Sequence, residues 1–132
     1  MQSFRNLKVW EKAHQLTLKI YAATASFPRE EAYGLTSQIR RAASSIGANI
    51  AEGCGRGSDA DLKYRLHIAM GSATELDNSL LLARDLSMLS VDTHEELLAD
   101  VTEVQKMLSS FIVRLRPGVA SVSRSTTDRV ND

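Results

Sequence analysis

The stretch from residue 35 to residue 56, LTSQIRRAASSIGANIAEGCGR, constrains the fold more than any other part of this 132-residue chain. Apolar and small residues recur in it at steps of three and four, which is the spacing of one buried helical face. This core row consists of Leu35, Ile39, Ala42, Ile46, Ile50 and Gly53. The stretch therefore predicts a helix that packs against other helices, and its many small side chains let those neighbours approach closely.

A second row, of polar residues, follows the same predicted helix at the same steps. It consists of Gln38, Arg41, Ser45, Asn49, Glu52 and Arg56. At ~100° per residue, this row lies on a face turned by about 100° from the core row. A solvated face seldom carries so regular a set of mixed donors and acceptors. We interpret the row as a partly buried hydrogen-bonding seam, within the bundle or between subunits; an open ligand surface is the alternative.

Heptad rows of apolar residues predict three further helices, at about residues 7–26, 59–89 and 93–116. Pro28 ends the first of them, and three glycines in residues 53–57 separate the 35–56 helix from the next. No alternating strand pattern competes. The expected fold is all-α: an antiparallel up-down-up-down four-helix bundle over residues 1–116, followed by a disordered tail over residues 117–132.

The predicted helix at 59–89 carries apolar residues on two opposite faces. Its core row includes Leu62, Leu66 and Leu76, and its second row consists of Tyr64, Ile68, Gly71, Glu75, Asn78 and Leu82. In a bundle of four helices the second face would meet another subunit, so Tyr64, Ile68 and Glu75 join the seam as candidates for an oligomer contact. A buried Glu75 needs a partner, and we expect an ion pair with Arg40 or Arg41.

Composition and charge narrow the class of protein. Hydrophobic residues make up 43% of the chain, but no apolar run approaches the ~18 residues that span a membrane. A single cysteine excludes an intrachain disulfide. A cytoplasmic protein that does not contact membranes is the default expectation. The net charge is zero, but residues 1–57 hold eight Lys/Arg and four Asp/Glu, and residues 58–132 hold eight and twelve.

The basic N-terminal half supplies the candidates for nucleic-acid binding. They are Arg5, Lys8, Lys12 and Lys19, in one row of the first helix, with Arg40 and Arg56 as extensions of that surface. Such a row is a footprint for a phosphate backbone, without a base-reading module. The alternative is that these cations form a solvated face or attract the acidic half of the same or another subunit.

Three patterns that resemble catalytic or metal sites are interpreted as structural. Glu11 and His14 match the Glu-x-x-His spacing of carboxylate-bridged metal bundles, but they point away from the core and lack a second copy of the motif. The glycines at 53–57 lack the preceding strand and the Gly-Lys-Ser/Thr of a phosphate loop. Cys54 is expected to be a small buried thiol, and His14, His67 and His94 to lie at the flank of a helix or at the surface. We therefore expect no enzyme, no metal and no cofactor.

Several segments of the chain resemble the family of proteins encoded in intervening sequences of bacterial 23S rRNA. The segments are FRNLKVW at 4–10, Phe27-Pro28, YGLTSQIRRAA at 33–43, Ser45-Ile46, NIAEG at 49–53, Arg56, and Gly71-Ser72 with Glu75-Leu76. The resemblance covers about residues 4–115. It implies an antiparallel four-helix bundle and a ring-shaped homopentamer. The family is similar in fold to the accessory proteins of diversity-generating retroelements, basic pentameric barrels that bind RNA and a reverse transcriptase.

Together, the resemblance and the basic half favour a non-enzymatic homo-oligomer that binds RNA or another nucleic acid. The resemblance also implies a nucleic-acid enzyme as a second partner. The alternative is a structural scaffold for protein interactions that binds no nucleic acid. In that case the polar row of the 35–56 helix and the second row of the 59–89 helix serve protein contacts only.

Overall fold

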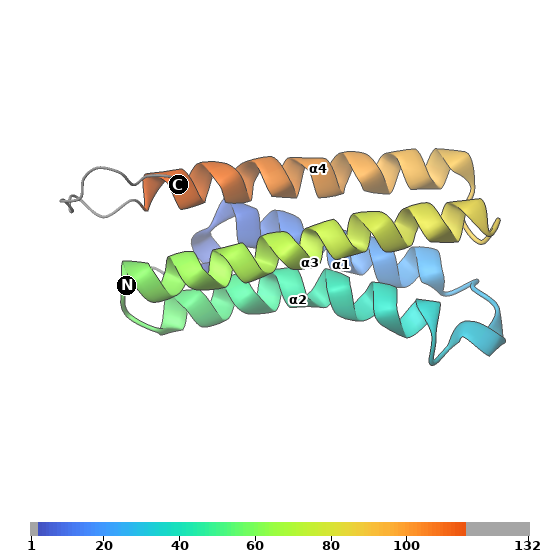
Figure 1. Cartoon of the computed structure of the whole chain (residues 1–132), viewed down its shortest axis with the longest axis horizontal. Helices are drawn as coiled ribbons and strands as arrows, with labels where there is room; N and C mark the ends of the chain where they lie inside the picture. Colours follow the sequence, from blue (N-terminus) through green and yellow to red (C-terminus); the bar gives the residue numbers. More distant parts are fainter. Residues whose placement is uncertain (1–2, 116–132) are drawn as a thin grey trace.

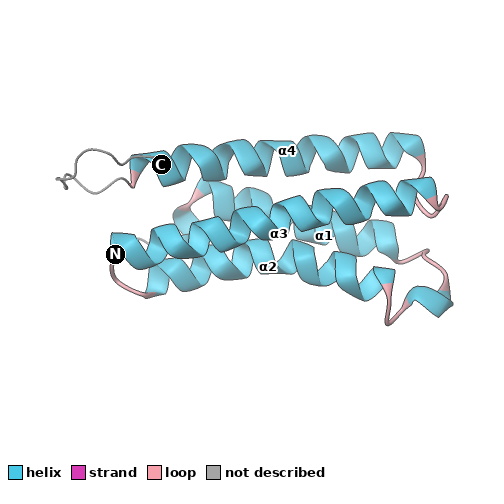
Figure 2. Ribbon diagram, in the orientation of Figure 1, coloured by secondary structure: helices cyan, strands magenta, loops and turns pink. Residues whose placement is uncertain are grey.

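The computed structural model describes residues 3–115, which form four long helices and two short 3-10 turns. The helices are α1 (Lys8–Thr24), α2 (Leu35–Gly55), α3 (Asp59–Asp85) and α4 (Val91–Arg114), and the turns are η1 (Phe4–Asn6) and η2 (Arg29–Glu31). Within residues 3–115 every regular element is helical (Figure 2). The tail expected over residues 117–132 lies outside the described residues.

The four long helices lie side by side and run alternately in opposite directions (Figure 1). Each helix contacts the next one along the chain, and α4 returns to contact α1, which closes the bundle. The most extensive contact joins α2 and α3, and the least extensive one between long helices joins α1 and α4. The predicted all-α, up-down-up-down four-helix bundle is confirmed.

The predicted core rows form one continuous core. Every member of the rows in α2 and α3 is buried, and so are Val9, Ala13, Leu16 and Ile20 of α1 and Leu97 to Leu108 of the α4 row. The rows meet at the centre because each advances along its helix at the heptad step. Within residues 3–115, no helix combines the length and the apolar character needed to cross a membrane.

The α2–α3 turn brings two helices unusually close together. Gly57 takes a left-handed φ of 90°, and the Ser58 hydroxyl caps α3 by accepting a hydrogen bond from the Asp61 amide at 3.1 Å. At Gly53, an added Cβ would lie only 2.8 Å from Leu62 Cδ1 and 3.1 Å from Arg65 Cβ. A glycine is therefore needed at the end of α2 to let α3 pack against its backbone.

One predicted helix boundary was wrong by four residues. We expected the third helix to reach residue 89, but α3 ends at Asp85. Ser87 adopts φ 63°, and the amides of Met88 and Leu89 both donate to the carbonyl of Ala83. A residue in the left-handed conformation, followed by such hydrogen bonds, ends a helix. That residue is usually glycine, so the serine at position 87 did not indicate a helix end in the sequence.

Candidate nucleic-acid interface

The basic row of α1 faces an acidic row of α4. Lys12 Nζ lies 3.2 Å from Asp100 Oδ1 and 3.5 Å from Glu103 Oε1. Lys19 Nζ lies 2.9 Å from Asp100 Oδ2 and 3.8 Å from Glu96 Oε2. Lys12 and Lys19, two of the predicted phosphate ligands, therefore pair with carboxylates of the same chain. This agrees with the alternative interpretation, in which the basic half of the chain attracts its acidic half.

Asp100 is the centre of this network, with a side chain that is only 14% exposed. Burial acts to raise the pKa of Asp100, but the hydrogen bonds and charges of Lys19 and Lys12 outweigh it and hold the pKa below its usual value. The same hydrogen bonds to Asp100 raise the pKa of both lysines. The network therefore joins α4 to α1 where the packing between helices is sparsest.

Arg40 is held between α1 and α2. Its Nε donates to Thr24 Oγ1 at 2.8 Å and its Nη2 donates to the Tyr21 carbonyl at 3.2 Å. The guanidinium carbon lies 4.5 Å from the centroid of the Tyr21 ring, in cation–π geometry. Several of its donors are therefore committed to helix packing, which removes Arg40 from the set of freely available cations.

Five of the six residues in the polar row of α2 bond to side chains in the described part of the chain. Four of them reach α3, three by a hydrogen bond and Glu52 by an ion pair. Gln38 Nε2 donates to Ser79 Oγ at 3.4 Å, and Ser45 Oγ lies 2.9 Å from Ser72 Oγ. Arg65 of α3 donates from Nη1 to Asn49 Oδ1 at 3.3 Å. This hydrogen-bonded seam lies inside one bundle, between the two helices with the largest contact.

The end of this seam is ionic. Arg56 Nη2 lies 2.7 Å from Glu52 Oε2, and Arg65 Nη2 lies 3.4 Å from the same oxygen. The hydrogen bond from Arg56, followed by the charges of Arg65 and Arg56, lowers the pKa of Glu52. Arg41, the sixth member of the polar row, is exposed, and its guanidinium has no partner within residues 3–115.

The second row of α3 is open to solvent in the single chain. Tyr64 is 63% exposed and Leu82 is 47% exposed, while Ile68 is half-buried. The ion pair expected for Glu75 is not formed: Glu75 is exposed and has no cation partner within residues 3–115. The expectation was wrong because neither Arg40 nor Arg41 reaches this row: Arg40 bonds to Thr24 and Tyr21 of α1, and Arg41 is exposed.

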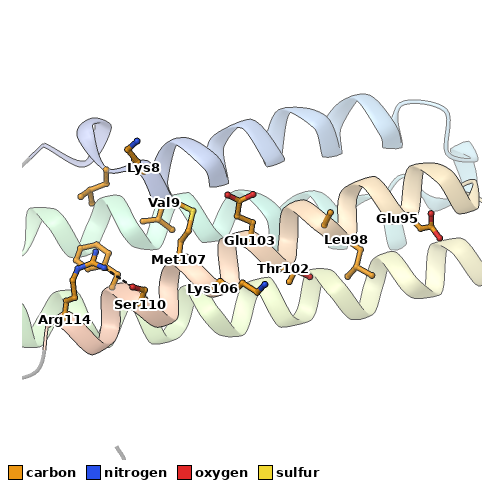
Figure 3. A pocket seen from close by; sticks show the side chains of 13 residues that line it. Lys8, Val9, Glu95, Leu98, Thr102, Glu103, Lys106, Met107, Ser110 and Arg114 are labelled. Carbon is orange, nitrogen blue, oxygen red and sulfur yellow. Dashed lines mark hydrogen bonds between the residues drawn. The ribbon is translucent and has the colours of Figure 1, made fainter.

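Arg5 and Lys8 are the two predicted nucleic-acid ligands whose charged groups have neither a carboxylate partner nor a hydrogen bond in the described part of the chain. Both are exposed, Arg5 in η1 and Lys8 at the start of α1. The guanidinium carbon of Arg5 lies 4.6 Å from the centroid of the Phe4 ring. Lys8 borders an open groove of about 1230 Å³ that runs along α4 (Figure 3).

Two further cations line this groove and were not among the predicted ligands. Lys106 and Arg114 lie on α4, and Glu95 and Glu103 are the groove's acidic residues. Neither cation was predicted as a ligand, because α4 belongs to the acidic half of the chain. Lys106 and Arg114 are eight residues apart, a spacing that places two side chains on the same side of a helix. This spacing could have indicated a shared basic surface.

The histidines and the cysteine form no metal-binding cluster within the described residues. No three His, Cys, Asp or Glu side chains gather there in a metal-binding arrangement. Cys54 is buried, as predicted, and burial raises the pKa of its thiol. His94 is also buried, at 4% exposure, so its assignment to a helix flank or the surface was wrong. It lies three residues before Leu97 and extends the core row of α4 by one turn.

Comparison with known proteins supports the resemblance found in the sequence. The profile of the 23S rRNA-intervening sequence protein family matches residues 5–110. The chain is also similar to the crystal structure of a protein of unknown function from the S23 ribosomal protein family of Bacteroides thetaiotaomicron. That match has a TM-score of 0.73 and 29% identity, and covers 80% of this chain and 95% of the other. No curated protein gives a significant match.

Proposed function

The chain belongs to the family of 23S rRNA-intervening sequence proteins, and from this premise we propose that it is a non-enzymatic, homo-oligomeric bundle that binds RNA. The binding surface lies at the start of α1. The protein acts in the cytoplasm, and a nucleic-acid enzyme is a second partner by the resemblance to retroelement accessory proteins. The solved relative is itself of unknown function, so the proposal depends on the arrangement of charges.

The observation that carries the proposal is the contrast between the two ends of the α1 basic row. Lys12 and Lys19 are matched by carboxylates of α4, whereas Lys8 and Arg5 have no carboxylate partner within residues 3–115. A phosphate backbone binds cations by displacing their small counterions, and cations already in ion pairs contribute less to that exchange. The unmatched end of the row therefore supports RNA binding better than the row as a whole.

Fluorescence anisotropy with a labelled RNA, titrated between 50 and 200 mM salt, tests this proposal. We expect Lys8→Gln to weaken binding at low salt and to lower the slope of log affinity against log salt by about 0.7 to 0.9, one phosphate contact. Lys12→Gln is the matched control, because Lys12 is engaged by Asp100 and Glu103. Equal losses in the two variants, or no RNA binding by the natural chain at low salt, would contradict the proposal.

Self-association is supported by a different observation, the exposed apolar residues on and near the second row of α3. Tyr64 is 63% exposed, Leu82 47% and Leu86 54%. Large apolar side chains left exposed along one side of a bundle are typical of an interface between subunits. A ring of five is the assembly that the resemblance implies.

Light scattering coupled to size-exclusion chromatography tests the assembly. Tyr64→Glu places a charge in the proposed interface and should convert the oligomer to a monomer, while Lys63→Glu, one position away on the same helix, should leave the mass unchanged. If the oligomer forms but binds no RNA at any salt concentration, the scaffold alternative replaces the RNA-binding proposal. A natural chain that is a monomer at micromolar concentration would contradict the proposal of a homo-oligomer.

A further inference from the structure

The groove along α4 is polarised in charge. Lys8 and Arg114 line it towards the end of α4 and Lys106 lies near its middle, while Glu95 lies near the start of that helix (Figure 3). Glu95 and Arg114 are 19 residues apart, which corresponds to about 28 Å of helix. Glu103, the other acid of the groove, lies 3.5 Å from Lys12 Nζ, which also contacts Asp100. One end of the groove therefore presents cations that no carboxylate of the described chain neutralises.

The same end of the groove has an apolar floor. Leu7, Val9, Met107 and Phe111 line it beside the cations. Arg114 lies against this floor, with its guanidinium carbon 5.4 Å from the centroid of the Phe111 ring and Nη1 donating to Ser110 Oγ at 3.0 Å. A guanidinium has five N–H donors, so most of the donors of Arg114 are available to a ligand.

We infer that this groove binds a single-stranded segment of RNA, with Lys8, Lys106 and Arg114 on phosphates and Phe111 with Met107 under a base. The inference rests on the proposed function and names the site and the form of the nucleic acid. Cations that follow a backbone beside an aromatic stacking platform are the usual means by which proteins hold single strands.

The shape of the groove favours a polymer segment over a small metabolite. Its volume of about 1230 Å³ exceeds the ~300–1,000 Å³ of typical small-molecule sites, and it is open along its length. A double-stranded RNA would place only phosphates and sugars against the protein, since its bases are stacked inside. The apolar residues of the groove would then contact no base. We therefore favour single-stranded RNA over double-stranded RNA as the ligand. An acidic peptide also has negative charge but lacks a planar base for the Phe111 ring.

Anisotropy titrations of the full-length chain test the inference with a labelled 12-nucleotide single strand and a duplex of the same sequence. The double variant Lys106→Gln with Arg114→Gln should lower the salt slope by about 1.4, or 0.7 for each phosphate contact on a single strand. Phe111→Leu keeps an apolar side chain and should weaken binding about fivefold or more without changing that slope. Arg29→Gln is the control, since Arg29 is exposed in η2 at the other end of the bundle.

The outcomes separate this inference from the proposed function. If the natural chain binds RNA but the double variant binds with the same affinity and slope, the groove is not the site and the proposed function stands. No RNA binding at all overturns both. Preference for the duplex overturns the single-strand assignment, and equal competition by a 12-residue poly-glutamate peptide replaces RNA by an acidic protein partner. Circular dichroism of each variant shows whether the fold is kept.

Discussion

Two buried threonines of the bundle differ in whether their hydroxyls are bonded. Thr24 is 2% exposed; its hydroxyl donates to the Ile20 carbonyl at 2.8 Å and accepts from Arg40 Nε at 2.8 Å. Thr36 is 8% exposed, and its Oγ1 has no hydrogen-bond partner in residues 3–115. A buried hydroxyl without a partner costs stability, whereas a bonded one contributes to it.

Valine substitutions at these two positions should therefore have opposite effects on stability. We expect Thr36→Val to raise the free energy of unfolding by up to about 1 kcal/mol, because it removes an unsatisfied polar group at nearly constant shape. Thr24→Val should lower it by roughly 1 kcal/mol or more, because it leaves Arg40 without its acceptor. Urea unfolding followed by circular dichroism measures both changes, and two changes of the same sign would contradict this explanation.

The exposure of single residues was only partly predictable from the sequence. His94 is buried and both ring nitrogens lack a hydrogen-bond partner within residues 3–115. Its polar side chain suggested the surface, but its step from Leu97 continued the buried row, and the periodicity was the better guide. Tyr64 is 63% exposed in the single chain, and the contact with another subunit that was expected for its row stays a prediction.

At the scale of helices, glycine positions distinguish close packing from open surface. Gly53, in the last turn of α2, lies against Leu62 and Arg65, whereas a Cβ at Gly71 in the middle of α3 would meet no atom within 4 Å. Gly53→Ala should therefore destabilise the bundle by about 1–3 kcal/mol through overpacking. Gly71→Ala, its matched control, should stabilise it by roughly 0.5–1 kcal/mol through helix propensity. Thermal unfolding at pH 7 compares them, and an unchanged midpoint for Gly53→Ala would refute the close approach.

The α1–α4 contact should depend on pH through Asp100. Its pKa is lower in the folded chain than in the unfolded one, so its stabilising contribution is complete above about pH 4, the usual pKa of aspartate, and is lost as pH falls through the folded value. Asp100→Asn should remove about 1 kcal/mol of stability at pH 7 and flatten the acid limb of the stability curve.

Glu95→Gln provides the control for this pH dependence. Glu95 is exposed on the same helix and has no ion pair within residues 3–115, so its substitution should change stability by less than about 0.5 kcal/mol at pH 7. Denaturant unfolding between pH 2 and pH 7 compares the two variants with the natural chain. Parallel curves for Asp100→Asn and the natural chain would show that the lysine network does not stabilise the fold.

For the whole molecule, the fold was predictable and the interface was not. Heptad rows defined each buried helix face, and connections as short as Arg56–Ser58 force neighbouring helices to be antiparallel, so four rows fix the bundle. The same rows do not say which neighbour covers a flank. The lysines at positions 12 and 19 were therefore taken as a nucleic-acid surface, although α4 covers them with acids, and the cations of the α4 groove were assigned no ligand.

For the seam of α2, the spacing of the polar residues predicted that the face is hydrogen-bonded but not which residues it contacts. Its regular step predicted a polar face with specific partners, but the partners Ser72, Ser79 and Arg65 belong to α3 and have no motif of their own. Identifying them requires knowing which helix lies on which side. That information comes from the handedness of the bundle, which the spacing of residues along one helix does not contain.

Size-exclusion chromatography with light scattering, run at low salt with and without a single-stranded RNA, tests the central proposal most directly. The account predicts a mass several times that of one chain without RNA, and co-elution of RNA with that species that disappears as salt is raised. A monomeric chain that elutes apart from the RNA at every salt concentration would contradict it.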